Sequence, residues 1–350
     1  MELLSVTMND GVKPRSEIEG KDNSSEDKSN YKIVRKGDMV YNSMRMWQGA
    51  NGISPCDGIV SPAYTVLMPK QEINNGYFAA LFKSANLINE FRKNSQGMTS
   101  DTWNLKYPQI ETIKVQVPSV SEQDKVSELF GVLDARIVAQ AQLIEALKKY
   151  KRGVNNQILS QIDNSYNCRL GSVCEIVGGG TPDTLHTEYW GNTVEWFTPS
   201  EIGKTKYVNN SVRKLSDIGL DNSSAKLLPI GTVLLTTRAT LGEMSIAKRE
   251  CSTNQGFQSL IPHTDRVSSE YLYYMQIIIK PWCEKYASGN TFREISKSAL
   301  SDCIIPIPDR ARQEQIVKLL SSIDMLIGAA ESISMSLSKI RLGLMQQLFI

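Results

Sequence analysis

The feature that most constrains the fold of this 350-residue chain is an internal duplication. A shift of 190 residues lays 117–159 over 307–349 without a gap and produces ten identical pairs. A fixed spacing of self-similarity is typical of a repeated structural unit, so both copies should fold alike. The identical pairs include Pro118/Pro308, Gln123/Gln313, Asp134/Asp324, Gly153/Gly343 and Gln157/Gln347.

The duplication continues upstream of this stretch. Shared helix composition could explain ten identities, but further matches occur in the same order at shifts of 192 to 194, which favours duplication of a whole unit. They are Gly37-Asp-Met-Val with Gly231-Thr-Val-Leu, Arg45-x-x-x-Gly49 with Arg238-x-x-x-Gly242, and Gly97-x-Thr99 with Gly289-x-Thr291.

The second part of each copy has the pattern of a long helix. Apolar residues recur every three or four positions, and no proline occurs between 120 and 163. Pro118 ends the preceding segment, and Ser121 with Asp124 resembles a capping box. The predicted stripes are Val126, Leu129, Leu133, Ile137, Ile144, Leu147, Val154 and Ile158, and then Ile316, Leu319, Ile323, Ile327, Leu337, Ile340, Leu344 and Leu348.

A helix of about 40 residues is roughly 60 Å long and needs a partner for its single apolar stripe. The simplest partner is the other copy, in an antiparallel, coiled-coil-like pair. An alternative stays open, in which each helix packs separately on its own globular head.

The first part of each copy mixes strand-like and helical runs. Strands are predicted over 38–41, 63–68, 232–235 and 259–261, helices over 76–91 and 269–285, and a closing strand over 113–117 and 303–307. The fold class is therefore α+β: two α/β heads separated by two long antiparallel helices, with a pseudo-twofold internal repeat. The predicted boundaries are 1–117 and 164–307 for the heads, and 118–163 and 308–350 for the helices. If the helices pair, the heads should lie at opposite ends and suit a ligand with two separated reading positions.

Catalytic motifs are absent from the sequence. Residues Gly178-Gly-Gly-Thr-Pro182 lack the lysine of a phosphate-binding loop, and no methyltransferase tetrad, nuclease-spaced acid pair or serine nucleophile elbow occurs. Only His186 and His263 are available as histidines, and the six cysteines form no Cys-x-x-Cys pair. An enzyme and a metal site are therefore disfavoured, and we expect reduced thiols and a cytoplasmic location without a membrane segment.

The net charge of +2 excludes DNA binding by bulk charge but leaves local basic patches possible. Arginine, asparagine and glutamine in short polar loops can read base edges, while lysines contact phosphates. For each such residue a solvated loop is the simpler reading, and the Arg–Gly pairs could instead hold a hairpin's shape. The candidate DNA-binding residues are Arg45, Gln48, Lys93, Gln96, Lys204, Lys206, Arg213, Arg238, Thr240, Asn254 and Arg293. The five tryptophans are expected to lie mostly in the core, with Trp47 the least certain.

Several motifs together resemble the specificity subunit of Type I restriction-modification systems. They are Glu175-Ile-Val-Gly-Gly-Gly-Thr-Pro182, Glu188-Tyr-Trp-Gly191, Ser288-Gly-Asn-Thr-Phe-Arg-Glu-Ile-Ser-Lys297, and Ile305-Pro-Ile-Pro308 with Gln313-Glu-Gln-Ile316, echoed at Val115-Gln-Val-Pro118 and Glu122-Gln123. The resemblance covers essentially the whole chain.

The resemblance implies a non-catalytic subunit that reads a bipartite, asymmetric site on double-stranded DNA. In that family, each target-recognition domain reads one half of the site. The long helices set the spacer and dock two methyltransferase subunits, and two restriction–translocation subunits then join. AdoMet, ATP and magnesium are implied for those partners and none for this chain. The spacer and docking residues expected here are Leu133, Ile137, Leu147, Ile323, Ile327 and Leu337.

One departure from the family pattern concerns the first head. Residues 169–192 have no counterpart there, because Leu3-Leu-Ser-Val aligns with Phe197-Thr-Pro-Ser. We therefore expect an N-terminally short first head in which residues 8–30 are a flexible, acidic insertion. The competing functions are a non-DNA coiled-coil scaffold and, less favoured, a stand-alone nuclease.

Overall fold

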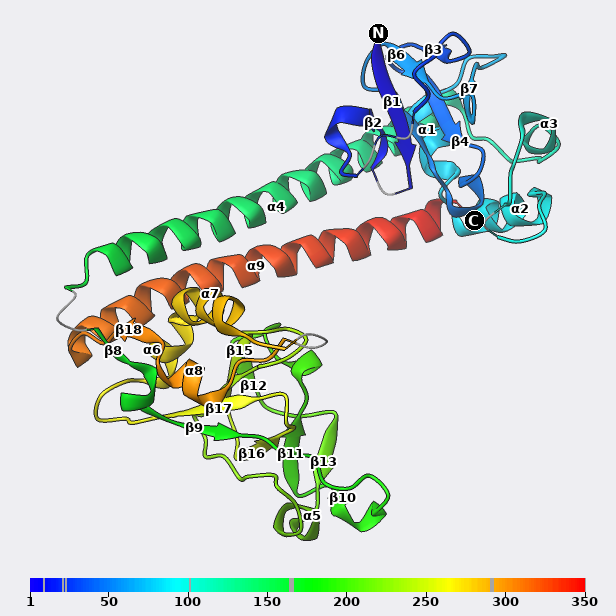
Figure 1. Cartoon of the computed structure of the whole chain (residues 1–350). Coiled ribbons are helices and arrows are strands. Elements are labelled where there is room, and N and C mark those ends of the chain that lie inside the picture. The colour runs from blue at the N-terminus through cyan, green and yellow to red at the C-terminus, as the bar shows by residue number, and fades with distance from the viewer. Residues whose placement is uncertain are drawn as a thin grey trace. The chain divides into compact units, whose positions relative to one another are not determined.

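The computed structural model describes residues 1–8, 10–20, 22, 24–100, 102–163, 167–289 and 293–349. The chain forms two compact units, Met1–Ile144 with Ala329–Ile350, and Glu145–Gly328. Each unit contains one mixed α/β head and about half of each of two long helices, α4 (Val120–Ser160) and α9 (Arg310–Leu348), which are continuous in Figure 1.

The described part of the first head contains two small sheets and three short α-helices. One sheet has the order β2 (Gly11–Pro14), β1 (Glu2–Thr7), β6 (Gly58–Val60), β3 (Lys32–Val34), and the other has the order β5 (Asn51–Ile53), β4 (Met39–Asn42), β7 (Tyr64–Leu67). The helices are α1 (Asn75–Leu81), α2 (Ala85–Asn94) and α3 (Tyr107–Ile110). Two apolar cores result, one between the sheets and one under the helices.

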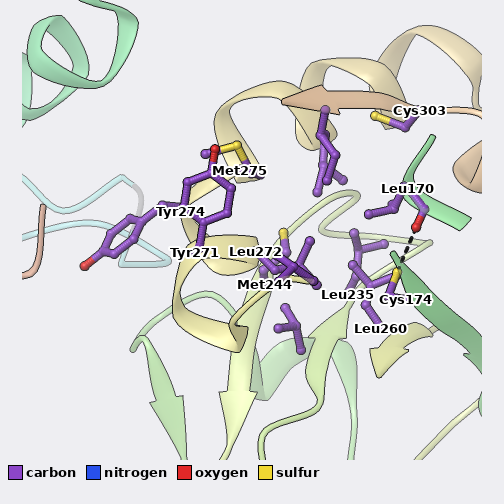
Figure 2. Packing of buried hydrophobic residues seen from close by; sticks show 14 of the residues in the cluster. Leu170, Cys174, Leu235, Met244, Leu260, Tyr271, Leu272, Tyr274, Met275 and Cys303 are labelled. Atoms are coloured by element: carbon purple, nitrogen blue, oxygen red, sulfur yellow. Dashed lines mark hydrogen bonds between the residues drawn. The ribbon is translucent and has the colours of Figure 1, made fainter. Parts of the chain in front are cut away.

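The second head is larger. One sheet has the order β12 (Tyr207–Val208), β15 (Met244–Ala247), β14 (Val233–Leu235), β17 (Gln258–Pro262), β9 (Cys174–Gly178), and another has the order β10 (Trp190–Gly191), β13 (Arg213–Leu215), β11 (Val194–Phe197), β16 (Cys251–Thr253). β18 (Ile304–Pro306) pairs with β8 (Asn167–Arg169). The helices are α5 (Asp217–Asp221), α6 (Ser269–Tyr274), α7 (Gln276–Tyr286) and α8 (Lys297–Ser301). Figure 2 shows part of its main core.

Strand register confirms the internal repeat. In the first head Met39 pairs with Ile53 and Leu67, and in the second Val233 pairs with Ile246 and Leu260. The order β5-β4-β7 thus matches β15-β14-β17, at the shifts of 193 to 194 found in the sequence. The parallel pairs β1–β6 and β11–β16 also match. They make Leu4 the equivalent of Phe197, whereas the sequence alignment placed Leu3 opposite Phe197.

A matching glutamine ties each long helix to its own head. The Gln123 side chain accepts a hydrogen bond from the Asn74 backbone N–H at 2.9 Å and donates to the Pro118 carbonyl at 2.9 Å. Gln313 repeats this with the Ser268 N–H at 3.2 Å and the Pro308 carbonyl at 2.9 Å. Both glutamines are buried. This identical pair of the repeat therefore makes the same hydrogen bonds in each copy and joins each long helix to its head.

The two long helices also pair with each other, in antiparallel order. In the first unit the ring of Phe130 stacks on that of Phe349 at 5.7 Å, and Asp134 bonds Arg341 at 2.5 Å. In the second unit Lys151 Nζ lies 2.5 Å from Asp324. Since Ile158 and Ile316 also enter the second head's core, each helix packs both on its partner and on a head. The two readings of the sequence are therefore both realised.

Three local predictions were wrong. The capping box of α4 is Ser119 with Glu122, whose carboxylate accepts the Ser119 N–H at 3.0 Å, rather than Ser121 with Asp124. Leu129 and its equivalent Leu319 are exposed, because Phe130 and Leu320 take the buried position one residue later. Ile340 and Leu348 are exposed as well.

Two segments of the first head also differ from expectation. Residues 113–117 form no strand, although their counterpart in the second head is β18. β18 exists because β8 pairs with it, and the described part of the first head offers no equivalent strand. Residues 8–30 include β2, which pairs with β1, so this stretch is partly a structural strand rather than a loose insertion.

Candidate nucleic-acid interface

The Arg–Gly pairs of the repeat lie in equivalent hairpin loops. Arg45 and Gly49 are in the loop between β4 and β5, and Arg238 and Gly242 are in the loop between β14 and β15. Both glycines have a left-handed backbone conformation, with φ of 81° at Gly49 and 78° at Gly242. A Cβ on Gly242 would come within 2.9 Å of the Lys280 Cα. The glycines therefore shape the loops, while the arginine side chains are left for another role.

In the first head the Arg45 loop packs against α2. Arg45 is exposed, and no acidic partner for it occurs among the residues that the structure describes. Beside it Trp47 makes an edge-to-face contact with Trp103 at 5.2 Å, and the Arg92 guanidinium lies 5.8 Å from the Trp47 ring. Gln48 is half-buried at the end of the same loop.

Lys93 and Gln96 lie at the C-terminal end of α2, next to this aromatic cluster. Lys93 is exposed and its ammonium pairs with Glu90 at 2.7 Å. Gln96 is held by backbone hydrogen bonds with Asn104, at 3.0 and 2.9 Å, which leave its side chain at the surface. The four candidate residues of the first head are thus brought to one surface region, around Trp47.

In the second head, Arg238 has a partner. Its guanidinium Nε lies 2.9 Å from Glu294, and the Thr237 hydroxyl donates to the other oxygen of Glu294 at 3.3 Å. Thr240 and Arg293 line an open hollow of about 670 Å³ on this side of the loop. Arg293 is exposed and donates to the Glu284 carbonyl. Residues 290–292, which belong to the quoted motif and to the Thr99/Thr291 match, lie outside the described residues.

Asn254 belongs to the same neighbourhood but has a structural task. Its side-chain oxygen accepts the Gly256 N–H at 2.8 Å and shapes the loop before β17. Gly180 donates its N–H to the Thr253 carbonyl at 2.8 Å, so the Gly178–Pro182 loop packs directly on this turn. Beside this turn, the hydroxyl of the exposed Thr181 donates a hydrogen bond to the exposed side chain of Gln255.

The remaining three candidates lie elsewhere in the second head. Lys204 is exposed. Lys206 donates to Tyr274 and Ser321, each at 3.1 Å, and burial lowers the pKa of its ammonium. Its charge is thus engaged with α6 and α9, and it is less available to a phosphate than that of Lys204. Arg213 stacks on the Trp190 ring at 3.4 Å. The sequence singled out Arg213 but not its contact with Trp190, because the tryptophans were expected to lie mostly in the core.

A buried carboxylate supports the sheet beneath Arg213. Glu195 bonds Lys214 at 2.7 Å and accepts the N–H and the hydroxyl of Ser211 at 2.6 and 2.8 Å. Burial opposes its ionisation, but the hydrogen bonds from Lys214 and Ser211 outweigh this and hold the pKa of Glu195 below its usual value. The charge therefore stays in place at neutral pH and fixes β11 to β13.

The helix residues predicted for docking lie in the seam between α4 and α9. Ile323 and Ile327 are buried, and Leu133, Ile137, Leu147 and Leu337 are half-buried. A different apolar set faces outward and was not singled out in the sequence, because its spacing does not follow one stripe. It comprises Val132, Val138 and Leu143 on α4, and Met325, Leu326, Ile333, Met335 and Leu342 on α9.

The described residues show little catalytic chemistry. Within those ranges, no three His, Cys, Asp or Glu side chains gather as a metal site, and no helix has the length and apolarity to cross a membrane. All six cysteines are free thiols. Burial raises the pKa of Cys174, Cys251, Cys283 and Cys303 to about 12, which keeps these thiols protonated and unreactive.

Comparison with known proteins agrees with the duplicated architecture. The family model described as "Type I restriction modification DNA specificity domain" matches residues 5–149 and again 163–335. The Type I restriction enzyme MjaIX specificity subunit of Methanocaldococcus jannaschii is 36% identical over 186 residues, 52% of this chain and 43% of that protein. The EcoR124I/EcoR124II specificity subunit of Escherichia coli is 26% identical over 231 residues, 61% of this chain and 56% of that protein.

The chain thus spans about half the length of these curated relatives. Among solved structures, one described as showing complex assembly and conformational transition of the type I R-M system superposes with a TM-score of 0.60. It is 21% identical, with 93% of this chain and 84% of that chain covered. At this identity the likeness supports the fold: two heads and two long antiparallel helices.

Proposed function

Because the chain belongs to the Type I restriction modification DNA specificity family, we propose that it is the non-catalytic, sequence-specific DNA-binding subunit of such a system. The observation that carries the proposal is the duplicated arginine hairpin. Arg45 and Arg238 occupy the same loop position in two heads with matching strand register. Two equivalent reading loops suit a bipartite DNA site, one half for each head.

The residues around these loops have complementary chemistry. Arginine presents several planar donors to the acceptors of guanine, and Gln48, Gln96 and Thr240 can both donate and accept. Lys93 and Lys204 are exposed cations of the kind that contact phosphates. Since the loop sequences differ between the heads, the two half-sites should differ too, which makes the site asymmetric.

The long helices have two tasks in this proposal. The seam between them, with Leu133, Ile137, Leu147, Ile323, Ile327 and Leu337, holds the pair together and sets the spacer. Their outward apolar residues, such as Val138 and Met335, supply docking area for methyltransferase subunits. We propose two methyltransferase and two restriction–translocation subunits as partners, with AdoMet, ATP and magnesium acting in those subunits, in the cytoplasm.

The test is methylome sequencing of a strain that carries the cognate methyltransferase, with Arg45→Ala and Arg238→Ala variants of this chain. Each variant should impair recognition of one half of the bipartite motif and so lower methylation of the motif by about tenfold. The reason is that a bidentate arginine–guanine pair gives about 1–3 kcal/mol of discrimination. Arg35→Ala and Arg169→Ala are matched controls, since these exposed arginines of the two heads pair with Asp57 and Asp302 away from the loops. Both controls should methylate normally.

The competing functions predict other results. A methylome that does not change on deletion of the gene would contradict the proposal and favour a scaffold without DNA. Cleavage of DNA by the purified chain with a metal ion would favour a nuclease. Normal methylation by both loop variants, in complexes that assemble, would remove Arg45 and Arg238 from the reading surface.

A further inference from the structure

The residue that stands beside the loop arginine differs in charge between the two heads. In the second head, Glu294 and Ser288 exchange backbone hydrogen bonds at 2.9 and 3.0 Å as an isolated antiparallel bridge. In the first head, Asn104 and Gln96 form the same bridge, at 2.9 and 3.0 Å. Asn104 is therefore the structural equivalent of Glu294, at the shift of 190 found in the sequence.

In the second head, both carboxylate oxygens of Glu294 have a partner. The Thr237 hydroxyl donates to Oε1 at 3.3 Å, and Nε of Arg238 lies 2.9 Å from Oε2. The side chains of Arg238 and Glu294 are 42% and 35% exposed, so a ligand can reach the pair from solvent. Each carboxylate oxygen has two lone pairs, and Glu294 can therefore accept further hydrogen bonds.

In the first head, the equivalent position holds a neutral amide. Leu105 donates its N–H to the Ser43 carbonyl at 2.8 Å, which brings the adjacent Asn104 beside the Arg45 loop. The side-chain oxygen of Asn104 is buried and has no hydrogen-bond partner among the described residues. The described part of the first head thus presents neither a carboxylate nor an accessible amide oxygen at this position.

The space next to this position differs as well. Thr240 and Arg293 line the open hollow of about 670 Å³ in the second head, and Arg293 immediately precedes Glu294. The corresponding positions of the first head hold Trp47 and Trp103, whose rings contact each other at 5.2 Å. The second head therefore has room for the edge of a base next to its carboxylate, where the first head has two indole rings.

Binding of guanine by Arg238 would change the environment of Glu294. The guanidinium must turn from the carboxylate to form its fork with guanine O6 and N7. A carboxylate that loses its cation in a partly buried place is costly unless another donor replaces it. In the major groove, cytosine N4 and adenine N6 are such donors, whereas thymine O4 and guanine O6 are acceptors that a carboxylate repels.

We propose that Glu294 is a specificity-determining residue of the second head, which selects cytosine or adenine next to the guanine bound by Arg238. This inference rests on the proposed function and adds the base class that the second head accepts at one position. Asn104 is neutral and imposes no such selection on the first half-site. The two heads therefore share the arginine and differ in the residue that restricts the neighbouring base.

Selection from a DNA library tests the proposal on the complex of this chain with its cognate methyltransferase subunits. Duplexes with randomised half-sites compete for the complex, and the bound fraction is sequenced. Glu294→Gln keeps the shape of the side chain and adds a donor, so thymine or guanine should rise at least about fivefold at one position of the second half-site. Glu294→Asp keeps the charge and should retain the selection.

Two controls accompany these variants. Glu250→Gln removes an exposed carboxylate that follows β15, whereas the Arg238 loop precedes this strand, and it should select the same bases as the parent. The first half-site is an internal control, because its base preferences should not change in any variant of Glu294.

Three results would overturn the proposal. The first is an unchanged base preference in Glu294→Gln. The second is an equal loss of affinity for all sequences in this variant, because a purely structural role weakens binding without changing the selected bases. The third is a parent complex that enriches no bipartite motif, which would refute the proposed function and this inference together. The first two results leave the parent motif intact, so the two failures are distinguishable.

Discussion

The Gln140 side chain donates a hydrogen bond to the Ala330 carbonyl at 3.0 Å, and these two residues are equivalent positions of the repeat. This contact joins α4 and α9 within the first unit. The ion pairs agree, since Asp134–Arg341 and Asp324–Lys151 are the same pair with the helices exchanged. The same ion pair between the two helices therefore recurs once in each unit.

Replacing Gln140 should weaken the first unit. Gln140→Ala removes a buried hydrogen bond and leaves a small cavity, which together should cost about 1–2 kcal/mol in the free energy of unfolding. Thermal unfolding followed by circular dichroism measures the loss. Gln142→Ala is the matched control, because Gln142 is exposed on the same turn of α4 and should have no effect. Equal melting of both variants would show that the contact contributes nothing.

Lengthening both helices should change the spacer between half-sites. A repeat of residues 134–140 after Gln140 and of 323–329 after Ala329 adds two turns to each helix and keeps the buried faces aligned. An added length of about 10 Å corresponds to about three base pairs. Methylome sequencing should show a longer spacer with unchanged half-sites. An unchanged spacer would refute the ruler role, and insertion into α4 alone should disrupt the pairing and abolish methylation.

Glu195→Gln should destabilise the second head in a pH-dependent way. The folded-state pKa of Glu195 lies below its unfolded value of 4.5, so the stabilisation is complete above that value and is lost as pH falls through the lower folded pKa. The variant should lose about 2 kcal/mol near pH 7, and its difference in stability from the parent should shrink as the pH falls below 4.5. Denaturant titrations between pH 3 and 7 measure it. Glu175→Gln, at an exposed site, should follow the parent throughout.

Thiol reactivity should separate the six cysteines into two groups. Cys56 and Cys168 are half-buried, whereas the other four are buried and have a pKa raised to about 12. Titration with a thiol reagent at pH 8 should therefore modify two thiols of the native chain quickly and the other four only after denaturation. Rapid modification of all six would show that the cores are not packed as described.

The sequence predicted the repeat and both helices well, because their signals are local and recur at a fixed shift. It could not choose between Leu129 and Phe130 for the buried seam, since both adjacent residues fit an apolar stripe. It also missed contacts that join distant positions: Glu294 lies 56 residues from its partner Arg238, and Trp190 lies 23 residues from Arg213. The failed strand at 113–117 has the same cause, because a strand depends on a neighbour that the local pattern does not contain.

The Arg238–Glu294 pair bears on the order in which the two heads would engage DNA. Arg45 has no acidic neighbour among the described residues, so its field extends over about 8 Å at physiological ionic strength. The field of Arg238 is neutralised at close range by Glu294, and this carboxylate must be exchanged for a base or phosphate during binding. Under the proposed function, DNA therefore contacts the first head first, and binding of DNA by the second head is the slower and more selective step.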